Sequence, residues 1–158
     1  MTLIEAFEAA SLPGARLLIG GNGPMLDGLR ARATSSVDVL GWLDAAARES
    51  FFDSIDALVV PSEWKDPAPL VVNEARARYI PVIGARIGGI PELIAPSSHP
   101  LLFRPGDNVE LADRLTRFAG APGLYASGRD DGPLGWEAHL ELVTAAYDDA
   151  QRLARSGS

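Results

Sequence analysis

Short apolar runs alternate with amphipathic helical patterns along this chain, and this alternation restricts its fold more than any other feature. The runs are partly β-branched, as is typical of strands that are buried on both faces. Because short loops join the runs to helical segments, we expect an α/β domain with a mainly parallel sheet of about five strands between two helical layers. The expected strands are Arg16–Gly20, Val37–Leu40, Ala57–Val60, Pro81–Gly84 and Leu101–Phe103.

Apolar residues at helical spacing predict the intervening helices. Asp44 is the expected N-cap of one helix, and Asp107 with Glu110 has the spacing of a capping box at the start of another. The expected helices are Thr2–Ala10, Pro24–Ala33, Ala45–Phe52, Leu70–Arg78 and Asp107–Phe118. We expect residues 1–120 to form one domain, with residues 121–158 adding a Gly- and Pro-rich loop and a helix at Trp136–Ala150 that packs on or beyond it.

Length and charge exclude several functions. The 158 residues suit one domain, and 47% hydrophobic residues are sufficient for a packed core. The net charge of −7 argues against nucleic acid or an acidic membrane surface as the main partner. The sequence has no run of about 18 apolar residues and no signal-peptide pattern. The lack of cysteine fits a reducing cytoplasm, which is the expected location.

The stretch from Val59 to Ile94 carries the main functional signal. It reads as a strand, an acidic loop, a helix that Pro69 can open, a second strand and a glycine loop. Seven residues separate the carboxylates of Asp66 and Glu74. Carboxylates accept hydrogen bonds from hydroxyls, and N–H groups at a helix start attract phosphates. The stretch therefore suits a sugar attached to a diphosphate.

Each of these features also has a purely structural interpretation. Asp66 can be a helix-start acid, and Glu74 can be a solvated acid paired with Arg78 at i+4. The segments GGNGP, from Gly20, and GGIPE, from Gly88, can be ordinary turns. GGNGP fits neither the dinucleotide fingerprint nor the Walker A loop. His99 and His139 have no metal-ligand pattern around them, and nothing supports Ser62 as a nucleophile.

Taken together, the ordered segments resemble the C-terminal, donor-binding domain of GT-B glycosyltransferases, in particular the retaining glycosyltransferase group 1 family. The resemblance runs from LIEAF through LLIGGNGP, VLGWL, DALVVPSEW and the acidic segment. It continues through PVIGARIGGIPELI and LLFRPGD to the Trp136-Glu137 tail. It implies a Rossmann-like domain and transfer of a hexosyl group from a nucleotide-diphospho-sugar, with no metal ion or other cofactor.

The resemblance also assigns residues. The E-x7-E motif of the family falls on Asp66 and Glu74, which are the expected catalytic pair, although Asp66 is one methylene shorter than the usual Glu. The first acid usually contacts the donor sugar, and the second usually holds the ribose. The expected donor-binding residues are Gly21, Gly23, Gly41, Trp42, Leu43, Pro69, Leu70, Val71 and Glu74.

Two parts of the family pattern have no match here. The first strand of the domain, with a Gly-Arg motif and a following Lys that neutralise the diphosphate, would precede LIEAF. The N-terminal, acceptor-binding domain is also unmatched, and any peripheral association with a membrane would depend on it. The chain would then be the donor half of an enzyme, inactive alone. The alternatives are a stand-alone nucleotide-binding or interaction module, and a GT-B epimerase, whose acidic segment matches less well.

The unmatched strand is the central one in a 3-2-1-4-5-6 sheet. Without it, the strands near Leu18 and Leu58 face each other with unpaired ladder groups. We therefore expect either a segment from the absent domain or another chain to fill the central position, or the sheet to close with LLIG beside ALVV.

Overall fold

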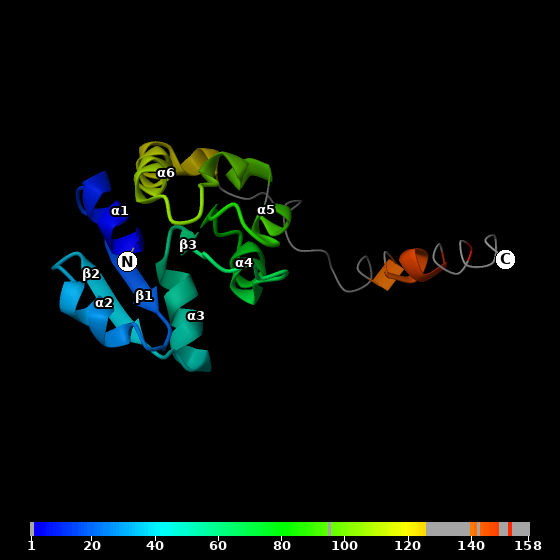
Figure 1. The fold of residues 1–158 in the computed structure, drawn as a ribbon, viewed down its shortest axis with the longest axis horizontal. Helices are drawn as coiled ribbons and strands as arrows, with labels where there is room; N and C mark the ends of the chain where they lie inside the picture. Colours follow the sequence, from blue (N-terminus) through cyan, green and yellow to red (C-terminus); the bar gives the residue numbers. More distant parts are fainter. Residues whose placement is uncertain (1, 95, 126–139, 142, 149–151, 153–158) are drawn as a thin grey trace.

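The structure is a computed structural model that describes residues 2–94, 96–125, 140–141, 143–148 and 152 (Figure 1). Strands and helices alternate through its first 125 residues, as the sequence predicts. Their bounds are α1 Thr2–Ala10, β1 Leu17–Gly20, α2 Leu26–Arg32, β2 Val37–Gly41, α3 Ala45–Ser54, β3 Leu58–Val60, α4 Leu70–Arg76, β4 Val82–Gly84, α5 Ile90–Leu93 and α6 Asn108–Gly120, with the 3-10 turns η1 Pro96–Leu101 and η2 Pro122–Leu124.

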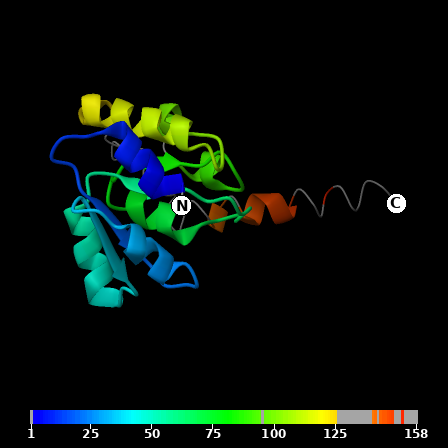
Figure 2. The same cartoon turned by 60° about the vertical axis from the view of Figure 1, so that its left-hand side comes forward.

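Two apolar cores lie on opposite faces of the strands and define three layers. Neighbouring residues of β4 point to opposite faces, so Ile83 joins one core and Val82 joins the other. The first core lies under α1 and α6, which lie side by side (Figures 1 and 2). The second lies under α3, α4 and α5. The predicted α/β class is therefore confirmed.

The strands form two separate parallel pairs instead of one sheet. β1 pairs with β2, from Leu17 opposite Val37 to Gly20 opposite Gly41. β3 pairs with β4, from Leu58 opposite Val82 to Val60 opposite Gly84. Among the described residues β1 and β3 share no ladder. The expectation that LLIG would close directly onto ALVV is therefore wrong.

The prediction of a strand at Leu101–Phe103 is also wrong. Leu101 is the last residue of η1, and the N–H of Leu102 donates to the carbonyl of His99, 3.1 Å away, which keeps the chain curled up to that point. Phe103 alone makes a bridge, to Ala85. Four strands and one bridge therefore replace the five predicted strands within residues 2–125.

Local capping determines where the helices start. Asp44 accepts the N–H of Ala47 at 2.8 Å, and Asp107 accepts that of Glu110 at 2.9 Å, so both predicted N-caps are confirmed. The reciprocal half of the capping box is not formed with Asp107. The Glu110 carboxylate instead accepts the N–H of Arg104 at 2.7 Å.

Most of the predicted helix bounds shift by one or two residues: α4 ends at Arg76 instead of Arg78, and α3 and α6 continue to Ser54 and Gly120. The helix predicted from Pro24 begins two residues later because a turn from Gly23 to Leu26 comes first. Of the helix predicted at Trp136–Ala150, residues 140–141 and 143–148 are helical, and the remainder lies outside the described residues.

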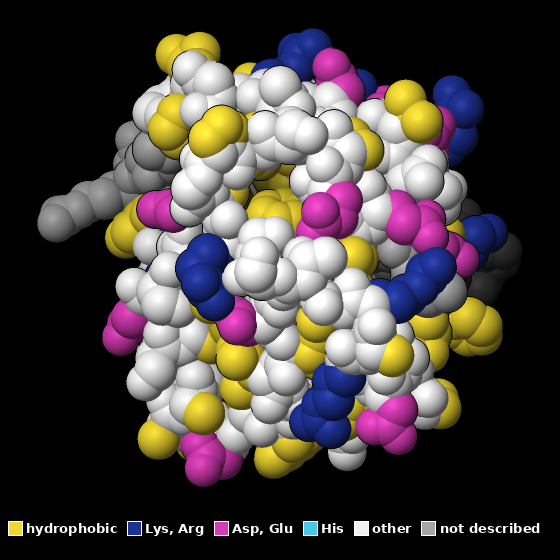
Figure 3. Space-filling model, turned by 90° about the vertical axis from the view of Figure 1, so that its left-hand side faces the viewer, with side chains coloured by type: hydrophobic (Ala, Val, Ile, Leu, Met, Phe, Trp, Pro, Cys, Tyr) yellow, Lys and Arg dark blue, Asp and Glu magenta, His cyan; other side chains and the backbone are white. Residues whose placement is uncertain are grey.

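Basic and acidic side chains alternate on the surface. Arg16 pairs with Asp38, Arg32 with Glu5, and Arg78 with Glu49. The face drawn in Figure 3 shows the two kinds interspersed. No helix in the described part of the chain is long and apolar enough to cross a membrane.

Candidate functional site

A cleft of about 490 Å³ opens where β1 and β3 end. Its floor is apolar, with side chains from β1, α3 and β3. Its polar side chains come from Arg48 of α3 and Glu74 of α4. In parallel α/β folds, ligands bind at this edge because the loops after the strands converge there. The lining residues are Leu3, Leu18, Ile19, Gly20, Gly21, Trp42, Leu43, Arg48, Phe51, Phe52, Leu58, Val59, Val60, Pro61, Val71 and Glu74.

Arg48 and Glu74 form an ion pair in this cleft. Arg48 Nη1 lies 3.3 Å from Glu74 Oε1, and the two side chains are 51% and 30% exposed. The pair is reachable from solvent, so each partner can exchange it for a ligand at little cost. A guanidinium donates to anionic oxygens and a carboxylate accepts from hydroxyls. The pair can therefore bind a ligand that carries both groups.

The predicted pairing of Glu74 with Arg78 takes a different form. Arg78 Nη1 donates to the backbone carbonyl of Glu74 at 3.0 Å, while its Nη2 donates to the Glu49 carboxylate at 2.5 Å. The hydrogen bond that Arg78 donates to the Glu49 carboxylate raises the pKa of Arg78 above its ordinary value. The guanidinium also lies over the Phe52 ring, 4.8 Å from its centroid. Arg78 thus ties α4 to α3, and the Glu74 carboxylate remains in the cleft.

Asp66 is held in its loop by local hydrogen bonds. Its Oδ1 accepts the N–H of Ala68 at 2.9 Å, and its carbonyl accepts the N–H of Gly89 at 2.9 Å. Asp66 is exposed and does not line the cleft. The structure therefore places Glu74 in the cleft, and Asp66 accepts a hydrogen bond within its own loop, before α4 begins.

Substitutions at Asp66 separate the contribution of its loop hydrogen bond to Ala68 from a need for its negative charge. Asp66→Asn keeps an oxygen that accepts the Ala68 N–H, so we expect the free energy of unfolding to stay within about 0.5 kcal/mol of the wild type. Asp66→Ala removes the acceptor and is expected to cost about 1 kcal/mol. Urea unfolding of both variants measures the difference. Equal losses in the two variants would contradict a stabilising role for the hydrogen bond from Ala68 to Asp66.

The two glycines of GGIPE pack directly on the acidic loop. A Cβ on Gly88, whose φ is +56°, would lie 2.3 Å from the Asp66 carbonyl oxygen, and one on Gly89 would lie 1.9 Å from that of Pro67. Both distances are too short for any side chain. These glycines therefore join the loop after β4 to the loop after β3, which is a packing role that the sequence left open.

The glycine loop after β1 borders the cleft. Gly21, with φ of +131°, donates its N–H to the carbonyl of Gly41 at 2.7 Å. Gly41 has φ of +77°. These conformations disfavour other residues, and they turn the two chain segments at the edge of the cleft.

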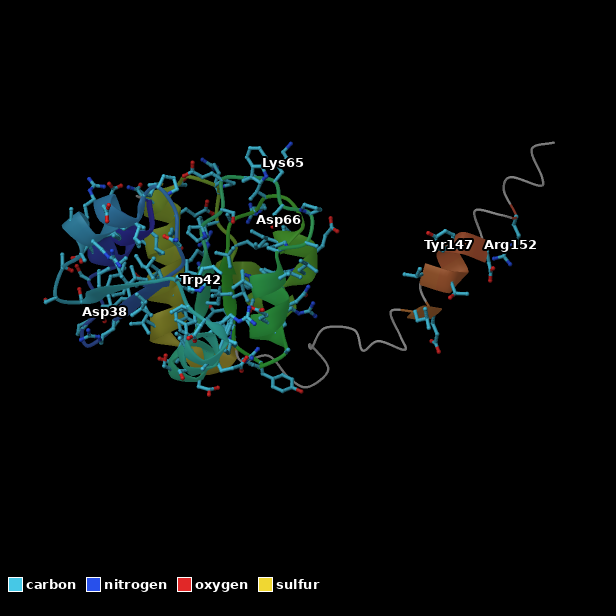
Figure 4. The ribbon with its side chains drawn as sticks, turned by 90° about the horizontal axis from the view of Figure 1, so that it is seen from below. Asp38, Trp42, Lys65, Asp66, Tyr147 and Arg152 are labelled. Carbon is cyan, nitrogen blue, oxygen red and sulfur yellow. The ribbon has the colours of Figure 1, made fainter. Side chains whose placement is uncertain are left out.

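Five of the predicted site residues line the cleft and five do not. In the view of Figure 4, Trp42 lies between Asp38 of β2 and the loop that carries Lys65 and Asp66. Trp42 is 77% exposed, so its ring stands at the rim. The residues that line the cleft are Gly21, Trp42, Leu43, Val71 and Glu74. Those that do not are Gly23, Gly41, Asp66, Pro69 and Leu70.

Sequence reasoning missed Arg48 as a site residue. It lies in an alanine-rich helix that matches no motif, and only the packing of α3 against α4 brings it to Glu74. One local feature could have indicated Arg48. It lies in the first turn of the helix that Asp44 caps, and this turn is at the edge of the strands where ligands bind. Within the described residues, no group of three or more His, Cys, Asp or Glu is arranged to hold a metal ion.

Comparison with known proteins finds a family that matches most of the chain. The family described as "Glycosyl transferases group 1" matches residues 1–120. Sulfoquinovosyl transferase SQD2 of Arabidopsis thaliana is 35% identical over 108 residues, which cover 66% of this chain and 21% of that protein. D-inositol 3-phosphate glycosyltransferase of Actinosynnema mirum is 32% identical over 165 residues, which cover 90% of this chain and 39% of that protein.

A solved structure shows the same fold. Anabaena Alr3699/HepE, in complex with UDP, has a TM-score of 0.67 and 24% identity, over 79% of this chain and 36% of that one. The chain therefore spans 21% to 39% of the length of these three proteins.

Proposed function

Because the chain belongs to the glycosyl transferases group 1 family, we propose that its cleft binds the nucleoside diphosphate of a sugar-nucleotide donor. In the enzyme that contains it, the sugar passes to an acceptor. The observation that carries this proposal is the Arg48–Glu74 pair in an apolar cleft at the ends of parallel strands. The solved structure of Anabaena HepE, which shares the fold, contains UDP, and this supports a nucleoside diphosphate as the ligand of the cleft.

Each polar side chain of the cleft has a role in this proposal. Glu74 accepts hydrogen bonds from the ribose hydroxyls, and its release from Arg48 on binding leaves the guanidinium to face the diphosphate. Asp66, in the neighbouring loop, contacts the sugar hydroxyls. The apolar floor and Trp42 at the rim provide surfaces for the base. The rest of the proposed donor contacts are Gly21, Gly23, Gly41, Leu43, Pro69, Leu70 and Val71.

The proposed chemistry is transfer of a hexosyl group with retention. Cationic side chains stabilise the charge that develops on the leaving diphosphate, which makes a metal ion unnecessary. Among the described residues that line the cleft, Arg48 is the cationic one. We further propose that acceptor binding and turnover need another domain facing the cleft, which fits the greater length of the relatives. The lack of cysteine is consistent with a cytoplasmic location.

Calorimetric titration of the full chain with UDP, GDP and ADP tests the binding step. We expect saturable heat for one of these diphosphates below millimolar concentration, and a higher melting temperature at saturation because ligand binding favours the folded state. The matching nucleosides serve as controls, since they lack the groups that face Arg48. No heat from any diphosphate up to millimolar concentration, with the chain folded by circular dichroism, would contradict the proposal.

A transfer assay separates an enzyme part from a stand-alone binding module. The chain alone is expected to bind donor without releasing sugar from it. Transfer that appears when a longer polypeptide containing this chain is used supports the enzyme. Binding without transfer in every longer form supports the module.

A further inference from the structure

Arg78 lies behind the cleft and contacts three groups that border it. It follows α4, which ends at Arg76, and it does not line the cleft. Its guanidinium contacts a backbone carbonyl of α4, a carboxylate of α3 and an aromatic ring of α3. Each of these groups belongs to a residue that lines the cleft or is next in sequence to one that does. Arg78 is therefore placed to affect the cleft without touching a ligand in it.

The first contact is with the carbonyl of Glu74. The backbone N–H of Arg78 donates to the carbonyl of Ala75 at 3.0 Å, instead of to that of Glu74 four residues back. Nη1 of the same residue donates to the Glu74 carbonyl at 3.0 Å. The last carbonyls of a helix lack regular backbone donors, and basic side chains near the end can bond to them. The guanidinium thus caps the turn of α4 that carries Glu74.

The turn after α4 fixes the backbone of Arg78. Tyr79 has φ of +58°, a left-handed conformation that is uncommon for a residue with a side chain. The N–H of Ile80 donates back to the carbonyl of Ala75 at 2.9 Å and closes this helix end. Because Ala75 is fully buried, the turn is anchored in the core. The side chain of Arg78 therefore starts from a fixed point at the end of α4.

The other two contacts are with α3. Nη2 of Arg78 donates to the carboxylate of Glu49 at 2.5 Å, and Glu49 directly follows Arg48. The guanidinium also lies over the ring of Phe52, 4.8 Å from its centroid, and this ring is buried in the core beneath α3 and α4. A guanidinium holds its donors in a rigid fork, so bonds to two helices fix both at once. Arg78 thus sets how α3 and α4 lie at the level of Arg48 and Glu74.

The Arg48–Glu74 ion pair is too exposed to hold the two helices by itself. In the proposed binding mode, Glu74 leaves this pair to accept bonds from the ribose. Arg78 bonds the Glu74 carbonyl and leaves its carboxylate free, so its contacts persist when the carboxylate changes partner. Arg78 can therefore keep α4 in place before and after ligand binding.

We propose that Arg78 is a positioning residue for Glu74. It holds the Glu74 carboxylate where it meets Arg48 in the free chain and the ribose hydroxyls when a donor is bound. The inference rests on the proposed function for the identity of the ligand. The contact between Arg48 and Glu74 tests it without a ligand.

Calorimetry of the full chain with Arg78→Met tests the effect on binding. Methionine keeps an apolar stem but has no N–H donors. We expect binding of the diphosphate and of the nucleoside to weaken by the same factor, about 5- to 10-fold, because both need Glu74. Arg78→Lys is a second variant that retains the charge. One ammonium group cannot replace the fork, so both affinities are again expected to fall by a common factor. Wild-type affinities in the two variants would overturn the proposal.

Arg114→Met is the matched control for a purely structural role. Arg114 also bonds a backbone carbonyl, that of Leu102, and a carboxylate, that of Glu110, and it does not line the cleft. Arg114→Met is expected to lower the melting temperature while both affinities stay within about twofold of the wild type. The same loss of affinity in Arg114→Met as in Arg78→Met would mean that any destabilisation weakens binding, and this overturns the proposal.

A double variant tests whether Arg78 acts through Glu74. In the Glu74→Ala chain, adding Arg78→Met should change diphosphate affinity by no more than about twofold, because the carboxylate that Arg78 positions is already gone. Losses that add in the double variant would show that Arg78 acts independently of Glu74, which also overturns the proposal.

Nuclear magnetic resonance of the Arg48 guanidinium gives a test without ligand. Glu74→Gln should shift the Arg48 N–H resonances in an otherwise wild-type chain, because it removes the charge of the partner 3.3 Å away. In the Arg78→Met chain we expect Glu74→Gln to shift them by less than about half as much. Equal shifts in the two chains would overturn the proposal. Absence of diphosphate binding by the unaltered chain would contradict the proposed function instead, and these resonances would still decide the role of Arg78.

Discussion

Gly89→Ala is expected to separate the two loops beside the cleft and to destabilise the fold by about 3 kcal/mol. Gly89 has an ordinary φ of −82°, so backbone preference is not the cause. The cause is space, because a Cβ would lie 1.9 Å from the carbonyl oxygen of Pro67. The backbone must move to relieve this contact, and the 2.9 Å hydrogen bond from Gly89 N–H to the Asp66 carbonyl is then lost.

Denaturant unfolding measures the loss of folding stability in Gly89→Ala, and the diphosphate titration measures whether separation of the two loops also changes ligand binding. Gly28→Ala is the matched control, since a Cβ there meets nothing within 4 Å and the residue lies inside α2. That control should gain about 0.5–1 kcal/mol, because alanine is the better helix former. A Gly89→Ala protein within about 0.5 kcal/mol of the wild type would show that the two loops are not held by this contact.

Glu74→Ala is expected to weaken diphosphate binding by about 10- to 100-fold, the range for losing a hydrogen bond to a charged group. The expected change in folding stability is small, at most about 1 kcal/mol, because the Arg48–Glu74 pair is partly exposed. Affinity and stability therefore separate in this variant, as they do for a residue that contacts ligand. Calorimetry and urea unfolding of the same preparation measure both.

Two further variants make this test specific. Arg48→Ala should weaken binding of the diphosphate but leave binding of the nucleoside nearly unchanged, whereas Glu74→Ala should weaken both. Glu8→Gln is the control, since Glu8 lies on α1, bonds to Thr34 and does not line the cleft. Unchanged diphosphate affinity in the Glu74→Ala protein would remove the ribose role from this residue.

The sequence was sufficient wherever the deciding interactions are local. β1 and β2 could be located because their apolar runs lie between turn residues, and the starts of α3 and α6 because Asp44 and Asp107 accept an N–H three residues ahead. Interactions of this kind form within a few residues, so their pattern is visible in order along the chain.

Local sequence patterns gave wrong predictions where residues far apart in the chain provide the hydrogen-bond or ion-pair partner of a backbone group or side chain. Leu101–Phe103 has the composition of a strand, yet the 3-10 turn before it leaves one bridge at Phe103. The carboxylate of Glu74 has an arginine at the helical spacing, yet it pairs with Arg48, which comes from another helix. Arg78 bonds the Glu74 carbonyl instead.

The sequence by itself therefore determined the α/β class, the order of the elements, the family and the candidate carboxylates. The tertiary structure alone decided that the strands form two separate pairs, that Arg48 meets Glu74, and that Gly88 and Gly89 fit against the acidic loop. The physical reason is range. Periodicity and capping act over one or two turns, whereas strand partners, ion pairs and close backbone contacts depend on where residues far apart in the chain come to lie.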